Sequence, residues 1–346
     1  MGGMRFGTQW GGAAIAPRVA LTRRVEAAGF DQVGYGGIGT WPVMLAEAAR
    51  ATSRIRLSTS VTEPLTHHPV MAATAAAALA EVSDGRVVLG YGTGDSIAKR
   101  LGRRPATLMH LREHVEAIRE LLAGREATFQ DRRCFLGAGL VQWEPVEVPI
   151  FLAAAGPRAM ALAAEIGDGV IANVGLSSGA LAGVLATVDA AMAQAGRVRP
   201  RPELWVFAIA VAHRDRDEAV RRAKGIVASS AHMAFQVTLE GKDVPDDLAG
   251  RVEEFAHHYD VTYHGSPGQT PNADLMDRLG LTDWLLDRFA IAGDSEACRA
   301  RIERLRADGV TNLWLSSFGL EETLELWQHE IMPAFRAGTE ETGSAP

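Results

Sequence analysis

Short apolar runs alternate with longer segments of helical spacing along most of the chain. Apolar runs of about four to eight residues predict buried strands, whereas apolar positions three and four residues apart predict helices. The predicted strands are Met4–Trp10, Gln32–Tyr35, Arg54–Val61, Arg86–Tyr91, Ile150–Ala154, Gly169–Val174, Leu204–Ala212 and Thr311–Phe318. Eight strands that alternate with helices predict an α/β protein with a single (β/α)8 TIM barrel.

Two long connections interrupt this alternation. Residues 124–149 predict a non-helical link between the fourth and fifth strands, and Ile226–Gly293 predicts a partly helical insertion between the seventh and eighth strands. Loops of this length in a compact domain are usually lids or binding segments. We therefore expect one domain over residues 1–346, with the insertion as a lid at about 226–293, and a last helix over Glu321–Phe335.

Composition narrows the class of protein. Of 346 residues, 47% are hydrophobic and 22% are charged, and the net charge of −7 leaves no basic surface for nucleic acid. No run of about 18 apolar residues predicts a membrane span, and the start of the chain lacks the pattern of a signal peptide. Cys134 and Cys298 are isolated, which fits reduced thiols. We expect a cytoplasmic protein.

Ligands of such barrels bind at the carboxyl ends of the strands. The fourth strand ends in the sequence VVLGYGTGDS, residues 87–96. Its three glycines fail the dinucleotide-binding pattern, because Asp95 stands where the last glycine should be. Asp95 is a general acid, a hydrogen-bond partner for a heterocycle, or the N-cap of a short helix.

The segment Ala155-Gly156-Pro157-Arg158 joins the fifth strand to a helix. Small residues let a ligand approach the backbone, and the amides and dipole of a helix start favour an anion. This pattern predicts a phosphate site. A tight turn with proline at the first helical position explains the same residues without a ligand.

Aromatic and imidazole side chains flank the predicted strand ends. Trp10 and Trp41 are suited to stack on a planar ring, or simply to pack in the core. His67 precedes the third helix and is suited to proton transfer, although a histidine in such a place is often only a surface residue.

Other histidines have alternative roles. His257, His258, Tyr263 and His264 lie in the insertion and are candidates for lid residues that reach over the site. The sequence HLREH, His110–His114, matches the inverted zinc-protease pattern His-x-x-Glu-His. Helical spacing puts both histidines on one face, but their helix belongs to the outer layer of the predicted barrel. We expect no metal site.

Several segments together resemble one known family. They are GFDQVGYG, RIRLSTSVTEP, LAEVSDGRVVLGYGTGDS, LREHVEAIRELLAG, PIFLAAAGPRAMALAAEIGDGVIAN and DRFAIAGDSEACRARIERLRADGVTNLWL. Their order and spacing resemble the luciferase-like monooxygenase superfamily, most closely its F420-dependent branch of methylenetetrahydromethanopterin-reductase-like enzymes. The resemblance covers nearly the whole chain and implies a barrel that binds F420, or alternatively FMN, at its strand ends.

The resemblance also implies roles for individual residues. In that family a non-proline cis peptide at the end of the third strand backs the cofactor ring, and it corresponds here to Ser60-Val61. An acid that donates a proton in some relatives corresponds to Asp95, which is one methylene shorter than glutamate. The phosphate or ribityl contacts that the resemblance implies are Ala154, Ala155, Gly156 and Pro157. At the end of the fourth strand, glycines would let a planar ring pass close to the backbone, and the further candidate cofactor contacts there are Gly92, Thr93, Gly94 and Ser96.

The sequence departs from the family after the second strand. Many relatives carry an Asp-His pair there, whereas this chain has Gly37 and Ile38. We therefore expect a more apolar pocket, and neither alcohol nor sugar-phosphate dehydrogenation. The proton would come from Asp95, His67 or a lid histidine. The candidate substrate contacts are Trp10, Trp41, Ile38, His257 and His258.

The function that the resemblance implies is hydride transfer between reduced F420 and an unsaturated substrate with a C=C or C=N bond. An FMN-dependent monooxygenase would share the fold and stays an alternative, as does a non-catalytic cofactor-binding subunit. The resemblance also implies a homodimer.

Overall fold

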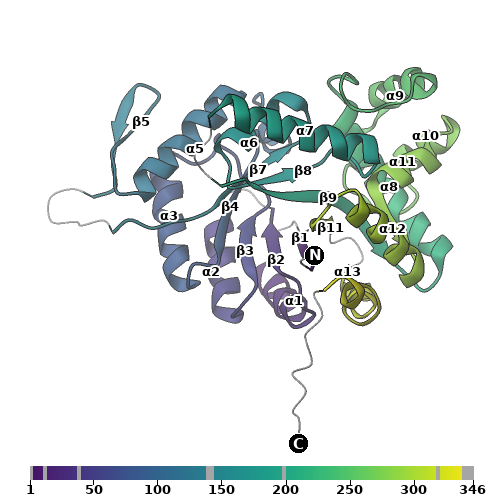
Figure 1. The fold of residues 1–346 in the computed structure, drawn as a ribbon, viewed down its shortest axis with the longest axis horizontal. Coiled ribbons are helices and arrows are strands. Elements are labelled where there is room, and N and C mark those ends of the chain that lie inside the picture. The colour runs from purple at the N-terminus through teal and green to yellow at the C-terminus, as the bar shows by residue number, and fades with distance from the viewer. Residues whose placement is uncertain are drawn as a thin grey trace, which may run out of the picture.

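The computed structural model describes residues 3–10, 14–36, 40–137, 144–196, 200–316 and 320–336. Within these ranges, eight parallel strands close into a barrel (Figure 1). They are β1 (Arg5–Trp10), β2 (Gln32–Tyr35), β3 (Arg56–Thr59), β4 (Val87–Tyr91), β7 (Ile150–Ala154), β8 (Gly169–Ala172), β9 (Glu203–Ala212) and β11 (Asn312–Ser316). Each strand pairs with the next in this order, and β11 returns to β1. The predicted (β/α)8 barrel is confirmed.

Helices cover the outside of this barrel (Figure 1). Those that alternate with its strands are α1 (Ile15–Ala27), α2 (Trp41–Ala51), α3 (Pro69–Val82), α5 (Leu108–Leu122), α6 (Pro157–Ile166), α7 (Ser178–Gln194), α12 (Ser295–Ala307) and α13 (Leu320–Glu325). A short helix, α4 (Asp95–Arg100), lies between β4 and α5. In α5, Leu111, Val115 and Ile118 are buried, as their helical spacing predicts. In the described ranges, no helix has the length and apolarity needed to cross a membrane.

Aromatic side chains fill the interior of the barrel. Trp205 of β9 and Trp314 of β11 meet edge to face, with ring centroids 5.6 Å apart. At the amino ends of the strands, Arg5 and Arg56 each lie 3.0 Å from a carboxylate oxygen of Glu203. Since these ion pairs occupy the amino end, the carboxyl end is where a ligand site is expected.

The insertion consists of four α-helices, a short 3-10 turn and one strand. Its elements are α8 (Arg216–Phe235), α9 (Asp246–His258), η1 (Val261–Tyr263), α10 (Pro271–Arg278), α11 (Thr282–Phe289) and β10 (Ala290–Gly293). The first helix runs across the predicted start at Ile226, because its apolar face continues unbroken onto the barrel. These helices share an apolar cluster with the second half of β9.

The sequence analysis missed β10. This strand pairs in parallel with the second half of β9, with Ala290 opposite Ile209 and Gly293 opposite Ala212. The first half of β9 closes the barrel by pairing with β8 and β11. The ten-residue strand β9 is therefore shared between the barrel and the insertion. The prediction of one domain over residues 1–346 stays a prediction.

The connection between β4 and β7 contains a feature that its sequence did not predict. An antiparallel hairpin, β5 (Ala127–Phe129) and β6 (Arg132–Cys134), projects from the barrel beside α5 (Figure 1). Its strands are only three residues long, which is too short for a clear alternation of apolar and polar positions.

The last helical segment is not the single helix predicted over Glu321–Phe335. After α13 the chain continues as a π-helix, Leu326–Ile331, and a 3-10 turn, Met332–Phe335. Pro333 lies in this turn and lacks the N–H that a regular α-helix would use. Pro333 therefore cannot continue the segment as a regular α-helix.

Candidate functional site

The loop after β3 begins with a cis peptide bond between Ser60 and Val61. This is the position that the resemblance to the luciferase-like superfamily implies. Ser60 Oγ donates to Oε1 of Gln9 in β1, and the same oxygen accepts a hydrogen bond of 2.8 Å from Trp314 Nε1. Gln9 was not singled out from the sequence, because only the closed barrel brings β1, β3 and β11 together.

The glycines at the end of β4 make room for the loop after β3. A Cβ on Gly92 would lie 3.0 Å from a methyl group of Val61, and a Cβ on Gly94 would lie 2.7 Å from Cβ and Cγ of Glu63. Gly94 also has a φ of +79°, which favours glycine. Thr93 is half-buried between them. These glycines therefore serve packing within the protein, whatever they also do for a ligand.

Asp95 is the first residue of α4, and Gly94 is its N-cap. The hypothesis that Asp95 caps this helix is therefore wrong, because the chain enters the helix one residue earlier. The Asp95 carboxylate lies 2.9 Å from Nζ of Lys99, one turn further along α4. It thus faces both a cation and the positive end of the helix dipole. Ser96 follows as the second residue of the helix.

Glu63 is a candidate site residue that the sequence analysis did not name, and it is only 3% exposed. Its Oε2 accepts hydrogen bonds of 2.5 and 3.2 Å from the amides of Leu65 and Thr66, and its Oε1 accepts one of 2.5 Å from the Thr66 hydroxyl. Thr66 Oγ1 is in turn 2.9 Å from Nδ1 of His67. We call Glu63, Thr66 and His67 the rim chain. An acid shortly after Ser60-Val61, followed by Thr-His, was the signal that could have found it.

His67 and the two candidate tryptophans are partly or fully enclosed. The rings of His67 and Trp41 meet at 63° with centroids 5.8 Å apart. Burial lowers the pKa of His67 below its ordinary value, and the charge of Glu63 opposes this shift. Trp10 and Trp41 are buried, and among the described residues neither indole N–H has a hydrogen-bond partner. Unused buried donors are uncommon and suit a ligand-binding wall. Ile38 lies outside the described residues.

The start of α6 is open to an anion. Ala154 ends β7, Gly156 is the N-cap and Pro157 is the first helical residue, while no side chain of the described chain caps this end. Ala155 is half-buried before it. A Cβ on Gly156 would meet nothing within 4 Å. The first amides of the helix are therefore available to an anionic group, as the sequence predicts.

The neighbouring helix α7 has a different start. Ser177 is its N-cap, and the Ser177 hydroxyl donates a hydrogen bond of 2.8 Å to Asp243 of the insertion. A Cβ on Gly179 would lie 2.5 Å from Oδ2 of the same aspartate. Because a carboxylate already occupies this helix start, an anion would bind at α6 in preference to α7.

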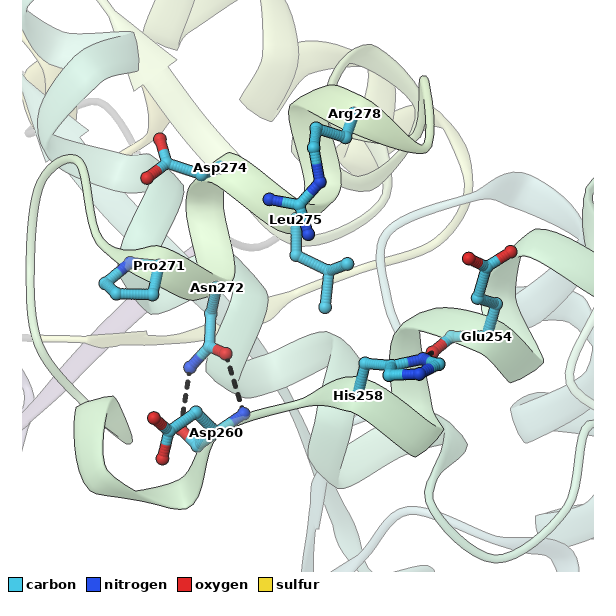
Figure 2. A pocket seen from close by; sticks show the side chains of 8 residues that line it. All are labelled: Glu254, His258, Asp260, Pro271, Asn272, Asp274, Leu275 and Arg278. Carbon is cyan, nitrogen blue, oxygen red and sulfur yellow. Dashed lines mark hydrogen bonds between the residues drawn. The ribbon is translucent and has the colours of Figure 1, made fainter.

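The candidate lid residues His257 and His258 are exposed and lie at the carboxyl end of α9. His258 lines a pocket of about 480 Å³ between α9 and α10, together with Glu254, Asp274 and Arg278 (Figure 2). Within the described chain, no hydrogen bond or ring contact joins either histidine to the strand ends. The structure does not bring them together with the other candidate residues.

Another part of the insertion lies near Asp95. Hydrogen bonds join three of its residues, Ser229, Tyr259 and His264, which we call the insertion chain. Tyr259 Oη donates a hydrogen bond of 3.0 Å to Ser229 Oγ and lies 2.9 Å from His264 Nδ1. His232 of α8 stacks on Tyr259 with ring centroids 4.0 Å apart.

Electrostatic shifts connect this part of the insertion to α4. Burial is the main cause that lowers the pKa of His232 to about 4, with Lys99 lowering it further and Asp95 opposing. Burial and Lys99 also lower the pKa of His264, and Asp95 again opposes. The sequence named His264 among the lid candidates but missed His232, which helical spacing alone does not distinguish from a packing residue.

The HLREH pattern of α5 lies in a packed aromatic cluster. His114 is fully buried, with Nε2 3.4 Å from Tyr91 Oη, and burial lowers its pKa to about 3. His110 and His114 both pack against Phe129 of β5, with ring centroids 5.5 and 5.6 Å away. Across the described ranges, no group of three or more His, Cys, Asp or Glu side chains is arranged to hold a metal ion.

A model of the luciferase-like monooxygenase family matches residues 4–312. Since this match spans most of the chain, the protein belongs to that family.

Individual relatives extend the comparison. The 5,10-methylenetetrahydromethanopterin reductase of Archaeoglobus fulgidus is 29% identical over 300 residues, which are 85% of this chain and 87% of that protein. The solved structure of the coenzyme F420-dependent tetrahydromethanopterin reductase from Methanopyrus kandleri matches with a TM-score of 0.77 at 23% identity, covering 96% of this chain and 100% of that one. The FMN complex of the oxygenating constituent of 3,6-diketocamphane monooxygenase from Pseudomonas putida matches with a TM-score of 0.68 at 16% identity, covering 97% and 100%. These two structural likenesses show the fold alone.

Proposed function

We propose that this chain is an F420-dependent oxidoreductase that exchanges a hydride between the deazaflavin and a small substrate with a C=C or C=N bond. One observation carries the proposal. The loop that begins at Ser60-Val61 and the uncapped start of α6 both lie at the carboxyl end of the barrel. The resemblance implies the ring and the phosphate of the cofactor at these two points, which supports the proposal. The reductase of Archaeoglobus fulgidus, which is similar over most of both chains, supports this choice.

The residues present fit such a cofactor. The free amides after Gly156 suit its anionic part, and the surface around Val61 and Gly92 suits a planar ring. When bound, F420 supplies a hydride donor and acceptor. The proposed cofactor contacts are Ser60, Val61, Gly92, Thr93, Gly94, Ser96, Ala154, Ala155, Gly156 and Pro157.

The proton that accompanies the hydride is assigned to residues of the chain itself. Asp95 and His67 are the proposed proton-transfer groups, because both follow strand ends at the carboxyl end of the barrel, Asp95 after β4 and His67 after β3. Trp10 and Trp41 offer unused indole donors and an apolar wall that keeps water from the reacting atoms. His257 and His258 are left out of this proposal because, within the described chain, no hydrogen bond or ring contact joins them to the strand ends.

The test is a binding titration with F420, oxidised FMN and reduced FMN, followed by cofactor fluorescence. We expect F420 to bind at micromolar concentration and FMN to bind at least about tenfold more weakly, a difference of roughly 1.4 kcal/mol. Tight binding of FMN without binding of F420 would instead assign a flavin-dependent monooxygenase. F420 binding without turnover of any unsaturated substrate would assign a cofactor-binding subunit.

A matched pair of variants tests the anion site. Gly156→Asp places a negative charge where the phosphate is proposed, and Gly156→Asn places a neutral side chain of the same shape there. Both residues are good N-caps, so the helix itself should tolerate them. We expect the aspartate variant to bind F420 at least about tenfold more weakly than the asparagine variant. Equal affinities would mean that the phosphate lies elsewhere.

A homodimer is part of the same proposal and rests on the family resemblance. Light scattering of the purified protein at several concentrations would measure its mass. A mass that stays at that of one 346-residue chain would overturn it.

A further inference from the structure

The hydrogen bonds of the rim chain determine which nitrogen of His67 carries the proton. The Thr66 hydroxyl has one hydrogen, and it is donated to Glu63 Oε1 over 2.5 Å. Thr66 Oγ1 is also 2.9 Å from Nδ1 of His67. Since its hydrogen is already donated to Glu63, the hydroxyl oxygen can only accept a hydrogen bond from His67. His67 must therefore donate from Nδ1, which leaves the free electron pair of the neutral ring on Nε2. Among the described residues, Nε2 has no hydrogen-bond partner.

The rim chain is also held firmly in place. Glu63 is buried, and it accepts three hydrogen bonds, two of them from backbone amides. Hydrogen bonds to a carboxylate are stronger than those between neutral groups. On its other side the Glu63 stem packs against Gly94, where a Cβ would lie 2.7 Å away. Trp41 meets the His67 ring from the start of α2, 5.8 Å between centroids.

We propose that Glu63 and Thr66 are positioning residues that hold His67 with its proton on Nδ1 and present Nε2 as the atom that takes or gives a proton at the strand ends. The assignment of a reaction to this proton rests on the proposed function, whereas the tautomer does not. In a reduction, the neutral ring first takes a proton from water at Nε2. The hydride then brings two electrons and one hydrogen to the substrate, the imidazolium gives it one proton from Nε2, and the ring returns to its neutral form.

The charge balance around His67 suits reversible proton transfer. Glu63 faces it from its own loop and stabilises the imidazolium, while burial disfavours it. His114 on α5 also interacts with His67, and its pKa is lowered to about 3, so it is neutral near pH 7. The neutral ring is therefore the resting form near pH 7, and the charged form is accessible because a carboxylate is linked to it through one hydroxyl.

The experiment is nitrogen NMR of the cofactor-free full chain labelled with ¹⁵N-histidine, with the His67 signals assigned by their loss in His67→Gln. The proposal expects Nδ1 to be protonated and Nε2 to be unprotonated in the neutral ring. Thr66→Val removes the acceptor, and the tautomer ratio should shift towards Nε2–H by about tenfold. Thr66→Ser keeps the hydroxyl and should restore the original ratio, which separates the hydrogen bond from general packing.

A second variant tests the carboxylate. Glu63→Gln keeps the shape and an acceptor oxygen but removes the charge, so the pKa of His67 should fall. An Nε2–H tautomer in the unmodified protein, or equal tautomer ratios in the valine and serine variants, would overturn the proposal. If F420 does not bind but these signals behave as expected, the proposed function fails and the positioning of His67 stands. If F420 binds but the tautomer ratio of His67 is the same in the valine and serine variants, only the present inference fails.

Discussion

The rim chain and the insertion chain both end in an imidazole, but different groups anchor them. The rim chain begins at Glu63, a buried carboxylate that accepts hydrogen bonds from two amides and a hydroxyl. The insertion chain begins at Ser229, a neutral hydroxyl that donates 3.1 Å to the carbonyl of Gly225. A carboxylate supports a positive charge on the ring at the far end of the chain, whereas a neutral hydroxyl does not.

The surroundings of the two imidazoles widen this difference. At His67, the charge of Glu63 opposes the effect of burial on the pKa. At His264, the cation Lys99 acts in the same direction as burial, and Asp95 only partly offsets them. Burial therefore lowers the pKa of both rings, but only at His67 does the group that anchors the hydrogen-bonded chain oppose this shift. The predictions below test that contrast.

The largest expected effect is on turnover. His67→Asn should lower kcat by about 10²- to 10⁴-fold, the usual contribution of a general acid or base. His264→Asn is the matched change in the insertion chain and should lower kcat by less than about threefold. Steady-state rates with saturating cofactor give both values. Equal losses in the two variants would mean that the anchoring carboxylate does not distinguish the rings.

The second-largest expected effect is on the stability of the protein, through the contact between Gly94 and Glu63. Gly94→Ala places a methyl group 2.7 Å from the Glu63 stem and forces alanine into a φ of +79°. We expect a loss of about 2–5 kcal/mol in the free energy of unfolding, from left-handed strain and overpacking together. Urea denaturation measures it.

Gly102→Ala is the control for this change. Gly102 has a φ of +61° and nothing within 4 Å of its Cβ position, so only the strain of about 1–2 kcal/mol should remain. A loss in Gly94→Ala no larger than in this control would show that Glu63 can move aside.

A smaller effect concerns pH and the insertion. The pKa of His232 is lowered to about 4 in the folded state, so between about pH 6.5 and pH 4 the unfolded chain binds more protons than the folded one. The stability that this ring contributes is therefore complete above pH 6.5 and is lost as the pH falls to 4. The slope is at most about 1.4 kcal/mol per pH unit for one proton. His232→Gln should flatten it in denaturation measured across this range, while the same change at the exposed His257 should not.

The smallest expected effect is that of Tyr259→Phe. This change removes the hydroxyl that joins Ser229 and His264 in the insertion chain. We expect a loss of about 1–2 kcal/mol in the free energy of unfolding and no change in kcat. A fall in kcat with unchanged stability would give the insertion chain a catalytic role and remove the contrast with the rim chain.

The sequence predicted the barrel well because its strands and helices are local patterns. The apolar runs of β1, β4 and β9 and the helical spacing of α5 need no knowledge of the rest of the chain. The four-residue strand β10 was missed, since its register depends on a partner strand some 80 residues earlier, from Ile209 to Ala212. Local periodicity carries no information about such a partner.

The candidate site was predicted less completely for a similar reason. The helix start at Gly156 and Pro157 was found because its signal is a short run of residues. Glu63 was missed because its burial and its contact with Gly94 exist only after β3 and β4 pair. Among the insertion histidines, the sequence could not tell which face of α9 or α8 would turn towards the strand ends.

The shared strand β9 has a consequence for how the molecule unfolds locally. Its first half closes the barrel and its second half holds β10, so neither region can open fully without fraying the same ten-residue strand. Cooperative units of that kind exchange their amide hydrogens together. We therefore expect the amides of β9 and β10 to exchange with solvent at similar rates, which would make the insertion a fixed wall of the barrel mouth rather than a hinged cover.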